Sequence, residues 1–211
     1  MSHGVALTNP AAHASRLKNQ ENANVTSPIL HLDRPPGRMK RIHIIGRKNS
    51  GKTTLIVDLV GELTRRGRRV GTIKHTHHHH ELDTPGKDSH RHREAGSSAV
   101  GILSPQMNAV FWPRMQSGDS RSDRYRQFDS LMCDCDIVLV EGDSSAEAPR
   151  IEVYRSISEQ PPIASTDPAI LAVVSDDLLN LDLPIWPRLN IADIASRIEA
   201  LAGLGIDVPE E

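Results

Sequence analysis

The chain has 211 residues, which is long enough for one well-buried domain and short for two. Its 25 Lys and Arg against 27 Asp and Glu leave no overall charge to hold nucleic acid or a membrane surface, and two Trp, two Tyr and two Phe are too few for a base-stacking platform. We find neither an apolar run of membrane-spanning length nor a signal-peptide core. The sequence therefore predicts a soluble, cytoplasmic protein without nucleic-acid or membrane partners.

The first 38 residues are rich in Asn, Ser, Ala, His and Pro and show no sustained apolar period. We expect a disordered leader, because such a segment has too little apolar surface to offset the entropy of ordering it. Met39 stands directly before the first expected strand, so translation that starts at Met39 is the alternative. The folded domain is predicted to span residues 39–211.

The stretch Gly46–Thr54 matches the P-loop pattern G-x-x-x-x-G-K-[ST]. A short apolar strand, residues 41–45, precedes it, and a helix with one apolar face is expected to follow. In this pattern Lys52 reaches the β- and γ-phosphate oxygens, and the Thr53 hydroxyl binds Mg²⁺. The alternative is a glycine turn that binds nothing, but the order strand, glycine loop, helix favours phosphate binding. The apolar face of the helix carries Leu55, Ile56, Leu59, Val60 and Leu63.

The expected elements alternate between strands and helices along the rest of the chain. The P-loop helix is predicted to end at Gly67, and strands are expected at about 70–73 and 99–103, with a short candidate strand at 110–112. A polar loop over 117–123 leads into a helix that ends near Leu131. A fully buried strand over 137–140 ends in Glu141, a half-exposed strand runs over 151–155, and a buried strand covers 170–174. Asn190 caps a last helix that ends at Gly203 and turns Ile191, Ile194, Ala195, Ile198 and Leu201 inward.

This alternation predicts an α/β fold, a P-loop NTPase with a doubly wound, mostly parallel sheet flanked by helices. Glu141 follows the buried strand at the point where P-loop enzymes keep the carboxylate of the Mg²⁺ shell. We expect the two cysteines, Cys133 and Cys135, to be reduced thiols, since two residues cannot form a disulfide framework or a complete metal site.

From Met39 onward the chain contains, in this order, the P-loop, Ile73-Lys74-His75-Thr76-His77-His78, Pro85-Gly86-Lys87-Asp88-Ser89, Leu139-Val140-Glu141-Gly142 and Asn180-Leu181-Asp182. On these motifs the chain resembles the molybdopterin-guanine dinucleotide biosynthesis protein B family, MobB. The resemblance implies a GTP-binding homodimer with weak GTPase activity that works beside MobA, the guanylyltransferase that attaches GMP to molybdopterin. It also implies that Lys52 and Glu141 are catalytic and that Thr53 and Glu141 hold Mg²⁺. The nucleotide site would comprise Gly46, Asn49, Ser50, Gly51, Lys52, Thr53 and Thr54.

Two features depart from the family's usual pattern. Asp143-Ser144-Ser145 stands where many members have an aromatic residue and a lysine, and the run of four histidines, 77–80, is longer than usual. The Asn-Lys-x-Asp element that reads guanine in many GTPases is absent, so Asp176 is only a candidate for binding the base. Neither a glutamine that orients water nor an arginine finger can be assigned, which suggests slow hydrolysis.

The segment after Lys74 is a candidate active-site loop, because ligands meet the carboxyl ends of strands in parallel sheets. Asp83 is a candidate second carboxylate for the Mg²⁺ shell, with a turn residue before Pro85 as the alternative. The candidate contacts for a pterin phosphate or an acidic partner surface, otherwise a solvated basic face, are Lys74, His75, His77, Lys87, Arg91 and Arg93. The alternative function is a metallochaperone, which would deliver nickel or zinc from the histidine run under control of GTP.

Overall fold

The computed structural model describes residues 38–77, 81–112, 123–158 and 160–205, all within one compact unit that spans residues 31–211. The expected leader lies outside the described residues except for Arg38, and so do His78–His80 and most of the expected polar loop over 117–123. No helix in these four stretches is long and apolar enough to cross a membrane.

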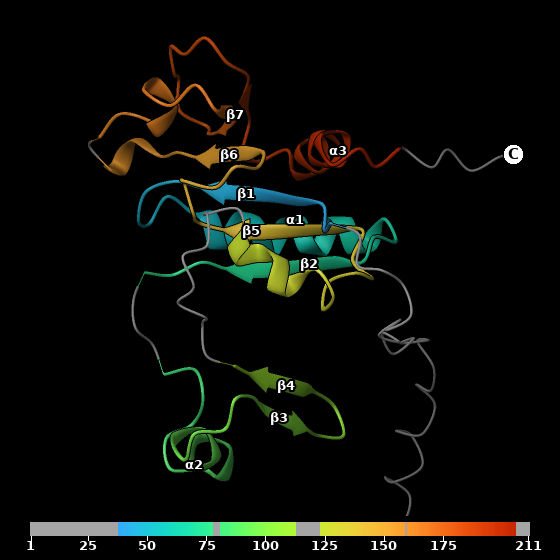
Figure 1. Cartoon of the computed structure of the whole chain (residues 1–211). Coiled ribbons are helices and arrows are strands. Elements are labelled where there is room, and N and C mark those ends of the chain that lie inside the picture. The colour runs from blue at the N-terminus through green and yellow to red at the C-terminus, as the bar shows by residue number, and fades with distance from the viewer. Residues whose placement is uncertain (1–37, 78–80, 113–122, 159, 206–211) are drawn as a thin grey trace, which may run out of the picture. The chain divides into compact units, whose positions relative to one another are not determined.

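A six-stranded sheet in the order β2-β5-β1-β6-β7-β8 forms the centre of the fold, and each pair of neighbouring strands is parallel (Figure 1). The α/β fold predicted from the alternating pattern is therefore confirmed. The carboxyl ends of β1, β5, β6 and β7 meet at one edge of the sheet. The strands are β1 (Arg41–Ile45), β2 (Val70–Lys74), β5 (Ile137–Glu141), β6 (Arg150–Val153), β7 (Ile170–Val174) and β8 (Ile185–Trp186).

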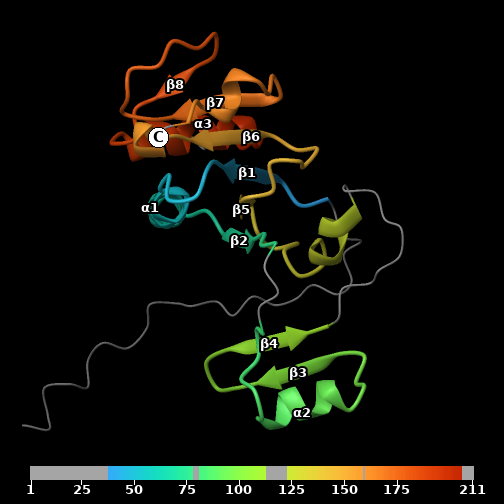
Figure 2. The same ribbon diagram turned by 90° about the vertical axis from the view of Figure 1, so that its left-hand side faces the viewer.

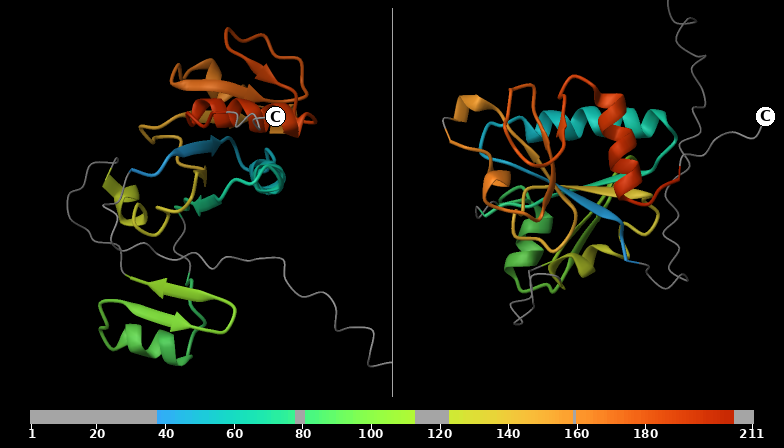
Figure 3. Two further views of the ribbon diagram at one scale, coloured as in Figure 1. Left: turned by 90° about the vertical axis from the view of Figure 1, so that its right-hand side faces the viewer. Right: turned by 90° about the horizontal axis from the view of Figure 1, so that it is seen from above.

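The two faces of the sheet have separate apolar clusters. Helices α1 (Lys52–Arg65) and α3 (Ile191–Leu201) cover one face, and the 3₁₀ segment η2 (Asp123–Phe128) lies on the other (Figures 2 and 3). Leu55, Leu59 and Leu63 of α1 are fully buried in the first cluster, as the helical period predicted. Tyr125 is the buried aromatic residue of the second cluster, which also contains Met39, Ile73, Val138 and Val140.

Between β2 and β5 the chain forms a short helix and a β-hairpin that are not part of the six-stranded sheet. The helix is α2 (Asp88–Glu94), and the antiparallel strands β3 (Val100–Leu103) and β4 (Asn108–Phe111) make a two-stranded sheet of their own. Strand β4 begins before the expected 110–112. The reason is a tight turn, in which the Ser104 N–H donates to the Met107 carbonyl, that reverses the chain directly before Asn108.

Three other expectations need correction or refinement. The helix expected to end near Leu131 is a 3₁₀ segment that ends at Phe128. The strand expected to be half-exposed, β6, is buried throughout because it lies between β1 and β7; buried Glu152 accepts hydrogen bonds from the N–H groups of Ile163 and Ala164. In α3, Leu201 is exposed, although Ile194, Ala195 and Ile198 are buried.

The ends of the helices follow their sequence signals. The Asn190 side chain accepts a hydrogen bond from the Asp193 N–H, as a capping residue does, and Gly67 and Gly203 adopt positive φ angles after α1 and α3.

Cys133 and Cys135 are free thiols, as expected. Two short 3₁₀ turns, η3 (Ser156–Ser158) and η4 (Ile163–Ser165), lie between β6 and β7.

Candidate nucleotide-binding site

The loop between β1 and α1 has backbone conformations that only its residue types adopt easily. Gly46 has φ of 143°, and a Cβ atom there would collide with the Val153 carbonyl and lie 2.8 Å from Ser50 Oγ. Asn49 and Gly51 also have positive φ, at 64° and 97°. Glycine at position 46 therefore lets the loop pack directly against the end of β6.

The first turn of α1 offers its backbone N–H groups without competition from its own side chains. Gly51 is the N-cap residue, no side chain caps the helix, and the first turn has no acidic residue. Ser50 Oγ is buried and has no hydrogen-bond partner among the described residues. These features make the start of α1 suitable for an anion, because the helix dipole and the unbonded N–H groups both favour negative charge.

Lys52 bends back over the loop. Its Nζ donates a hydrogen bond of 2.6 Å to the carbonyl oxygen of Arg47. Burial lowers the pKa of the Lys52 ammonium, an effect that nearby Glu141 opposes and nearby Lys74 strengthens. The ammonium thus lies at the mouth of the loop, where phosphate oxygens would stabilise its charged form.

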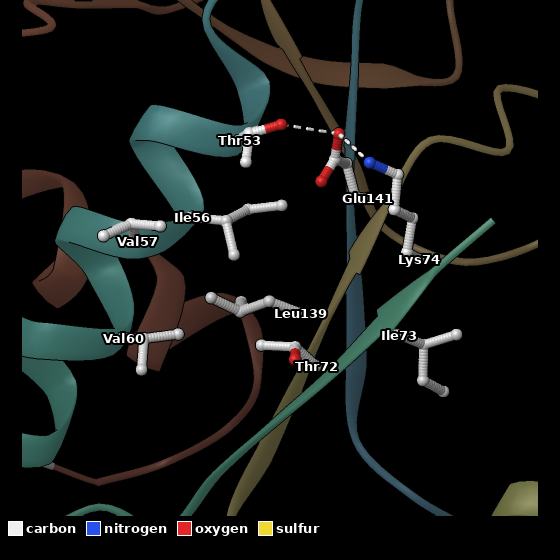
Figure 4. A pocket seen from close by; sticks show the side chains of 9 residues that line it. All are labelled: Thr53, Ile56, Val57, Val60, Thr72, Ile73, Lys74, Leu139 and Glu141. Carbon is white, nitrogen blue, oxygen red and sulfur yellow. Dashed lines mark hydrogen bonds and ion pairs between the residues drawn. The ribbon is translucent and has the colours of Figure 1, made fainter. Parts of the chain in front are cut away.

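The Thr53 hydroxyl donates a hydrogen bond of 2.8 Å to Oε1 of Glu141, and Lys74 Nζ lies 3.9 Å from the same oxygen (Figure 4). Glu141 ends β5 and is in register with Ile44 on β1 and with Lys74 on β2. A hydroxyl and a carboxylate oxygen this close fit Mg²⁺, which prefers a few protein oxygens beside phosphate and water. The three polar side chains edge a hollow of about 360 Å³ that is otherwise lined by Ile56, Val57, Val60, Thr72, Ile73 and Leu139.

The turn after Glu141 has a structural role that its sequence did not indicate. Asp143 is buried with φ of 59°, and its carboxylate accepts hydrogen bonds of 2.8 Å from the Tyr125 and Ser145 hydroxyls. Although burial opposes it, these bonds and the charges of Arg124 and His75 lower the pKa of Asp143. Asp143 therefore fastens the end of β5 to η2, so the departure from the family's pattern supplies an anchor.

Two histidines lie near this turn. Arg124 Nη1 donates to His75 Nε2 at 3.0 Å, and the His75 and His77 rings meet edge to face. His43 is fully buried, and its Nδ1 is 3.3 Å from the Gly142 carbonyl oxygen, so Nδ1 carries the proton. Burial lowers the pKa of His43 to about 4, against the opposing effect of the bond to Gly142. A histidine inside an apolar strand is the only sequence signal for this group.

A second hollow, of about 290 Å³, lies at the carboxyl ends of β6 and β7. Asp176 lines it, with Oδ1 accepting a hydrogen bond of 2.7 Å from the Arg188 N–H. A carboxylate has about four acceptor positions, so this bond leaves Asp176 able to accept two more from a base. Asp177 and Arg155 line the same hollow, and the sequence had not marked either as a site residue.

The cationic candidates on the loop after Lys74 fall into two groups. Arg93 forms an ion pair of 2.6 Å with Glu81, whereas Lys87, the N-cap residue of α2, and Arg91, in its last turn, are exposed. Arg91 Nη1 lies 3.9 Å from Oδ1 of exposed Asp88. Asp83 Oδ1 accepts from the Thr84 N–H at 2.8 Å and from Ser89 Oγ at 3.0 Å, and its place in a Mg²⁺ shell remains a prediction. Over residues 38–77, 81–112, 123–158 and 160–205, no group of three or more His, Cys, Asp or Glu could hold a metal ion.

Comparison with known proteins agrees with this geometry. Residues 41–176 match the family described as "Molybdopterin guanine dinucleotide synthesis protein B", MobB. The chain belongs to the MobB family. It is 37% identical over 158 residues to the molybdopterin-guanine dinucleotide biosynthesis adapter protein of Haemophilus influenzae, covering 74% of this chain and 85% of that one. With the Escherichia coli adapter protein the identity is 36% over 149 residues, covering 69% and 81%.

A crystal structure of a MobB protein has the same fold. That molybdopterin-guanine biosynthesis protein B is 28% identical to this chain, with a TM-score of 0.57 over 77% of this chain and 99% of the other. The MobB match covers the phosphate loop, Glu141 and Asp176, so the candidate residues for phosphate, Mg²⁺ and base lie within the matched range.

Proposed function

We propose that this chain binds GTP with Mg²⁺ and acts as an adapter in molybdopterin guanine dinucleotide synthesis, assisting a MobA-type guanylyltransferase. The observation that carries the proposal is the pairing of Thr53 with Glu141 at the start of α1, beside the ammonium of Lys52. Hydroxyl, carboxylate and ammonium together complement a magnesium-bound triphosphate. The adapter role comes from the names of the two bacterial relatives, and the pathway from those names and the description of the family.

The phosphates would lie over the N–H groups of the loop, with Lys52 on their outer oxygens and Thr53 and Glu141 holding Mg²⁺. Bound Mg²⁺ would draw negative charge from the terminal phosphates. Lys74 supports this arrangement, because its ammonium lies 3.9 Å from Glu141 Oε1 and adds positive charge beside the expected phosphates. The second hollow would take the base, with Asp176 accepting hydrogen bonds from guanine N1 and N2, which adenine cannot donate in the same way.

Hydrolysis of GTP by this chain alone is expected to be slow. Glu141 is engaged with Thr53 and Lys74, which suits metal binding better than activation of water. No glutamine is among the side chains that line either hollow of the described structure. GTP would then act mainly as a bound ligand that prepares the adapter for its partner.

The partners we propose are the guanylyltransferase, its substrate molybdopterin, and a second copy of this chain. Lys87 and Arg91 are exposed cations, and the Asp88 that Arg91 approaches at 3.9 Å is exposed as well. Both cations can therefore bind phosphates or an acidic protein surface. Among the described residues β2 is the outermost strand of the six-stranded sheet, and it lines one hollow with the exposed Val57 of α1, which supports a dimer contact there.

A reconstituted guanylylation assay tests the proposal. Purified guanylyltransferase, molybdopterin and Mg·GTP are incubated with this protein or with its Lys52→Ala variant, and the dinucleotide product is quantified. The proposal predicts faster product formation with the unmodified protein only. The proposal would be contradicted if the dinucleotide formed at the same rate with the unmodified protein, with the variant and with neither. Sedimentation of the protein with and without GTP tests the dimer separately.

A further inference from the structure

Arg155 places a guanidinium group on the phosphate loop. It directly follows Val153 and Tyr154 at the carboxyl end of β6, the strand beside β1. A Cβ atom built on Gly51 would lie 3.5 Å from Arg155 Cζ and 3.6 Å from its Nε and Nη2. The guanidinium therefore lies beside the N-cap of α1, where the N–H groups expected to bind phosphate begin, and only about the space of a methyl group separates it from Gly51.

The backbone on both sides of Arg155 is held in place. The Tyr154 N–H donates to the Val174 carbonyl at 3.0 Å, and the Ser156 N–H donates to Oδ2 of Asp177 at 2.6 Å. The Ser156 hydroxyl also donates to Oδ1 of Asp177, at 3.2 Å. Both carboxylate oxygens of Asp177 are thus used to fix the turn that presents Arg155, which limits where the guanidinium can go.

The guanidinium has no anionic partner in the described part of the chain. No carboxylate oxygen of a described residue forms an ion pair with it, although Asp176 and Asp177 line the same hollow. Arg47, the arginine within the P-loop motif itself, turns instead to the Pro161 carbonyl, with its Nη2 at 3.3 Å. Of these two arginines, Arg155 is the one whose guanidinium N–H groups remain available to a ligand beside the loop.

We propose that Arg155 is a nucleotide-binding residue whose guanidinium binds phosphate oxygens where the phosphate loop meets the hollow lined by Asp176. This inference rests on the proposed binding of GTP and extends it, since it assigns the phosphates a second cation besides Lys52. A guanidinium suits this position because its N–H groups bind two phosphate oxygens at once and it stays charged at any physiological pH. Asp177 acts as a positioning residue for it.

Titration calorimetry with Mg·GTP, Mg·GDP and Mg·ATP tests the assignment in the full-length protein. Arg155→Ala should weaken all three nucleotides by a similar factor of about ten to a hundred, because they share the phosphate chain. Arg155→Lys should restore part of the affinity by keeping the charge. Arg65→Ala is the matched control, as it removes an exposed arginine at the far end of α1, and it should bind GTP like the unmodified protein.

A double-mutant cycle tests the role of Asp177. Asp177→Asn should weaken GTP less than Arg155→Ala does, and the double variant should lose little more than Arg155→Ala alone, since both changes act through one side chain. Fully additive losses would contradict the positioning role.

Two results would overturn the assignment of Arg155 while leaving GTP binding in place. One is an Arg155→Ala variant that is folded by circular dichroism and binds GTP as well as the unmodified protein. The other is a loss confined to GTP and GDP, which would put Arg155 on the base. An unmodified protein that binds no nucleotide would instead overturn the proposed function, and the assignment with it.

Discussion

The Thr53 hydroxyl and the Glu141 carboxylate meet at 2.8 Å and join the first turn of α1 to the end of β5. If this pair holds Mg²⁺, Thr53→Val and Glu141→Gln should each weaken Mg·GTP about tenfold or more, because each removes one metal ligand without changing side-chain size. Binding measured in EDTA should change little. Thr64→Val, at the exposed end of α1, serves as the control for the loss of a threonine hydroxyl. Equal losses with and without Mg²⁺ would show that the pair does not act through the metal.

Asp176 is predicted to set the choice of base. The unmodified protein should bind GTP more tightly than ATP, and Asp176→Ala should narrow that difference by weakening GTP more than ATP. The reason is that only guanine offers two adjacent donors to a carboxylate. Competition of each nucleotide against a fluorescent GTP analogue measures the ratio. The assignment fails if the unmodified protein binds both nucleotides equally well.

Substitutions in the loop after Lys74 distinguish an adapter function from a metallochaperone function. Lys87→Ala with Arg91→Ala should slow stimulated guanylylation several-fold, because both cations are exposed, the pair of Arg91 with Asp88 included, and can bind phosphates or an acidic partner. Replacing His78, His79 and His80 by Ala should do little. Arg93→Ala should act differently, loosening the loop by breaking the pair with Glu81, which proteolysis would detect.

A metallochaperone would give the opposite pattern for this loop. It would bind nickel or zinc tightly and stoichiometrically, lose that binding with the histidines, and change its metal affinity about tenfold on GTP binding. Metal titrations at a pH where imidazole is neutral, with and without GTP, decide between the two functions.

His43 should make the fold sensitive to acid. Its pKa is about 4 in the folded chain against 6.5 for a free histidine, so the unfolded chain binds the extra proton first as the pH falls. The free energy of unfolding should therefore decrease between about pH 6.5 and pH 4, by up to about 3 kcal/mol from this group. Arg41 and His75 also disfavour the charged ring, while Asp143 favours it.

His43→Asn tests this prediction, because its amide can still donate to the Gly142 carbonyl but does not titrate. Urea unfolding at a series of pH values should give a flatter dependence for the variant over that range. The same slope for both proteins would assign the acid sensitivity to other groups.

The sequence predicted the parts of the fold that depend on local pattern. The P-loop motif, the apolar face of α1 and the cap at Asn190 each follow from residue types at short spacing, and the structure confirms them. The burial of Glu152 in β6 could not be predicted, because it depends on a partner segment, residues 163–164, that reaches the carboxylate only in the folded chain.

In the candidate site, too, some features were predictable from the sequence and others depend on the folded chain. The pairing of Thr53 with Glu141 was predictable, since both stand at ends of elements that parallel topology brings together. The position of the Arg155 guanidinium beside Gly51 and the anchoring of Asp143 by Tyr125 were not predictable, because they depend on side-chain directions across 104 and 18 residues of chain. The η2 segment that supplies Tyr125 had been expected as part of a longer helix.

Titration calorimetry of Mg·GTP into the full-length protein and its Lys52→Ala variant tests the central claim most directly. The ammonium of Lys52 would face phosphate oxygens with Mg²⁺ as the only rival for their charge, so its loss should weaken GTP about a hundredfold or more, about 2.7 kcal/mol, without changing the melting temperature much. A folded Lys52→Ala variant that binds GTP as tightly as the unmodified protein would contradict nucleotide binding at the loop between β1 and α1.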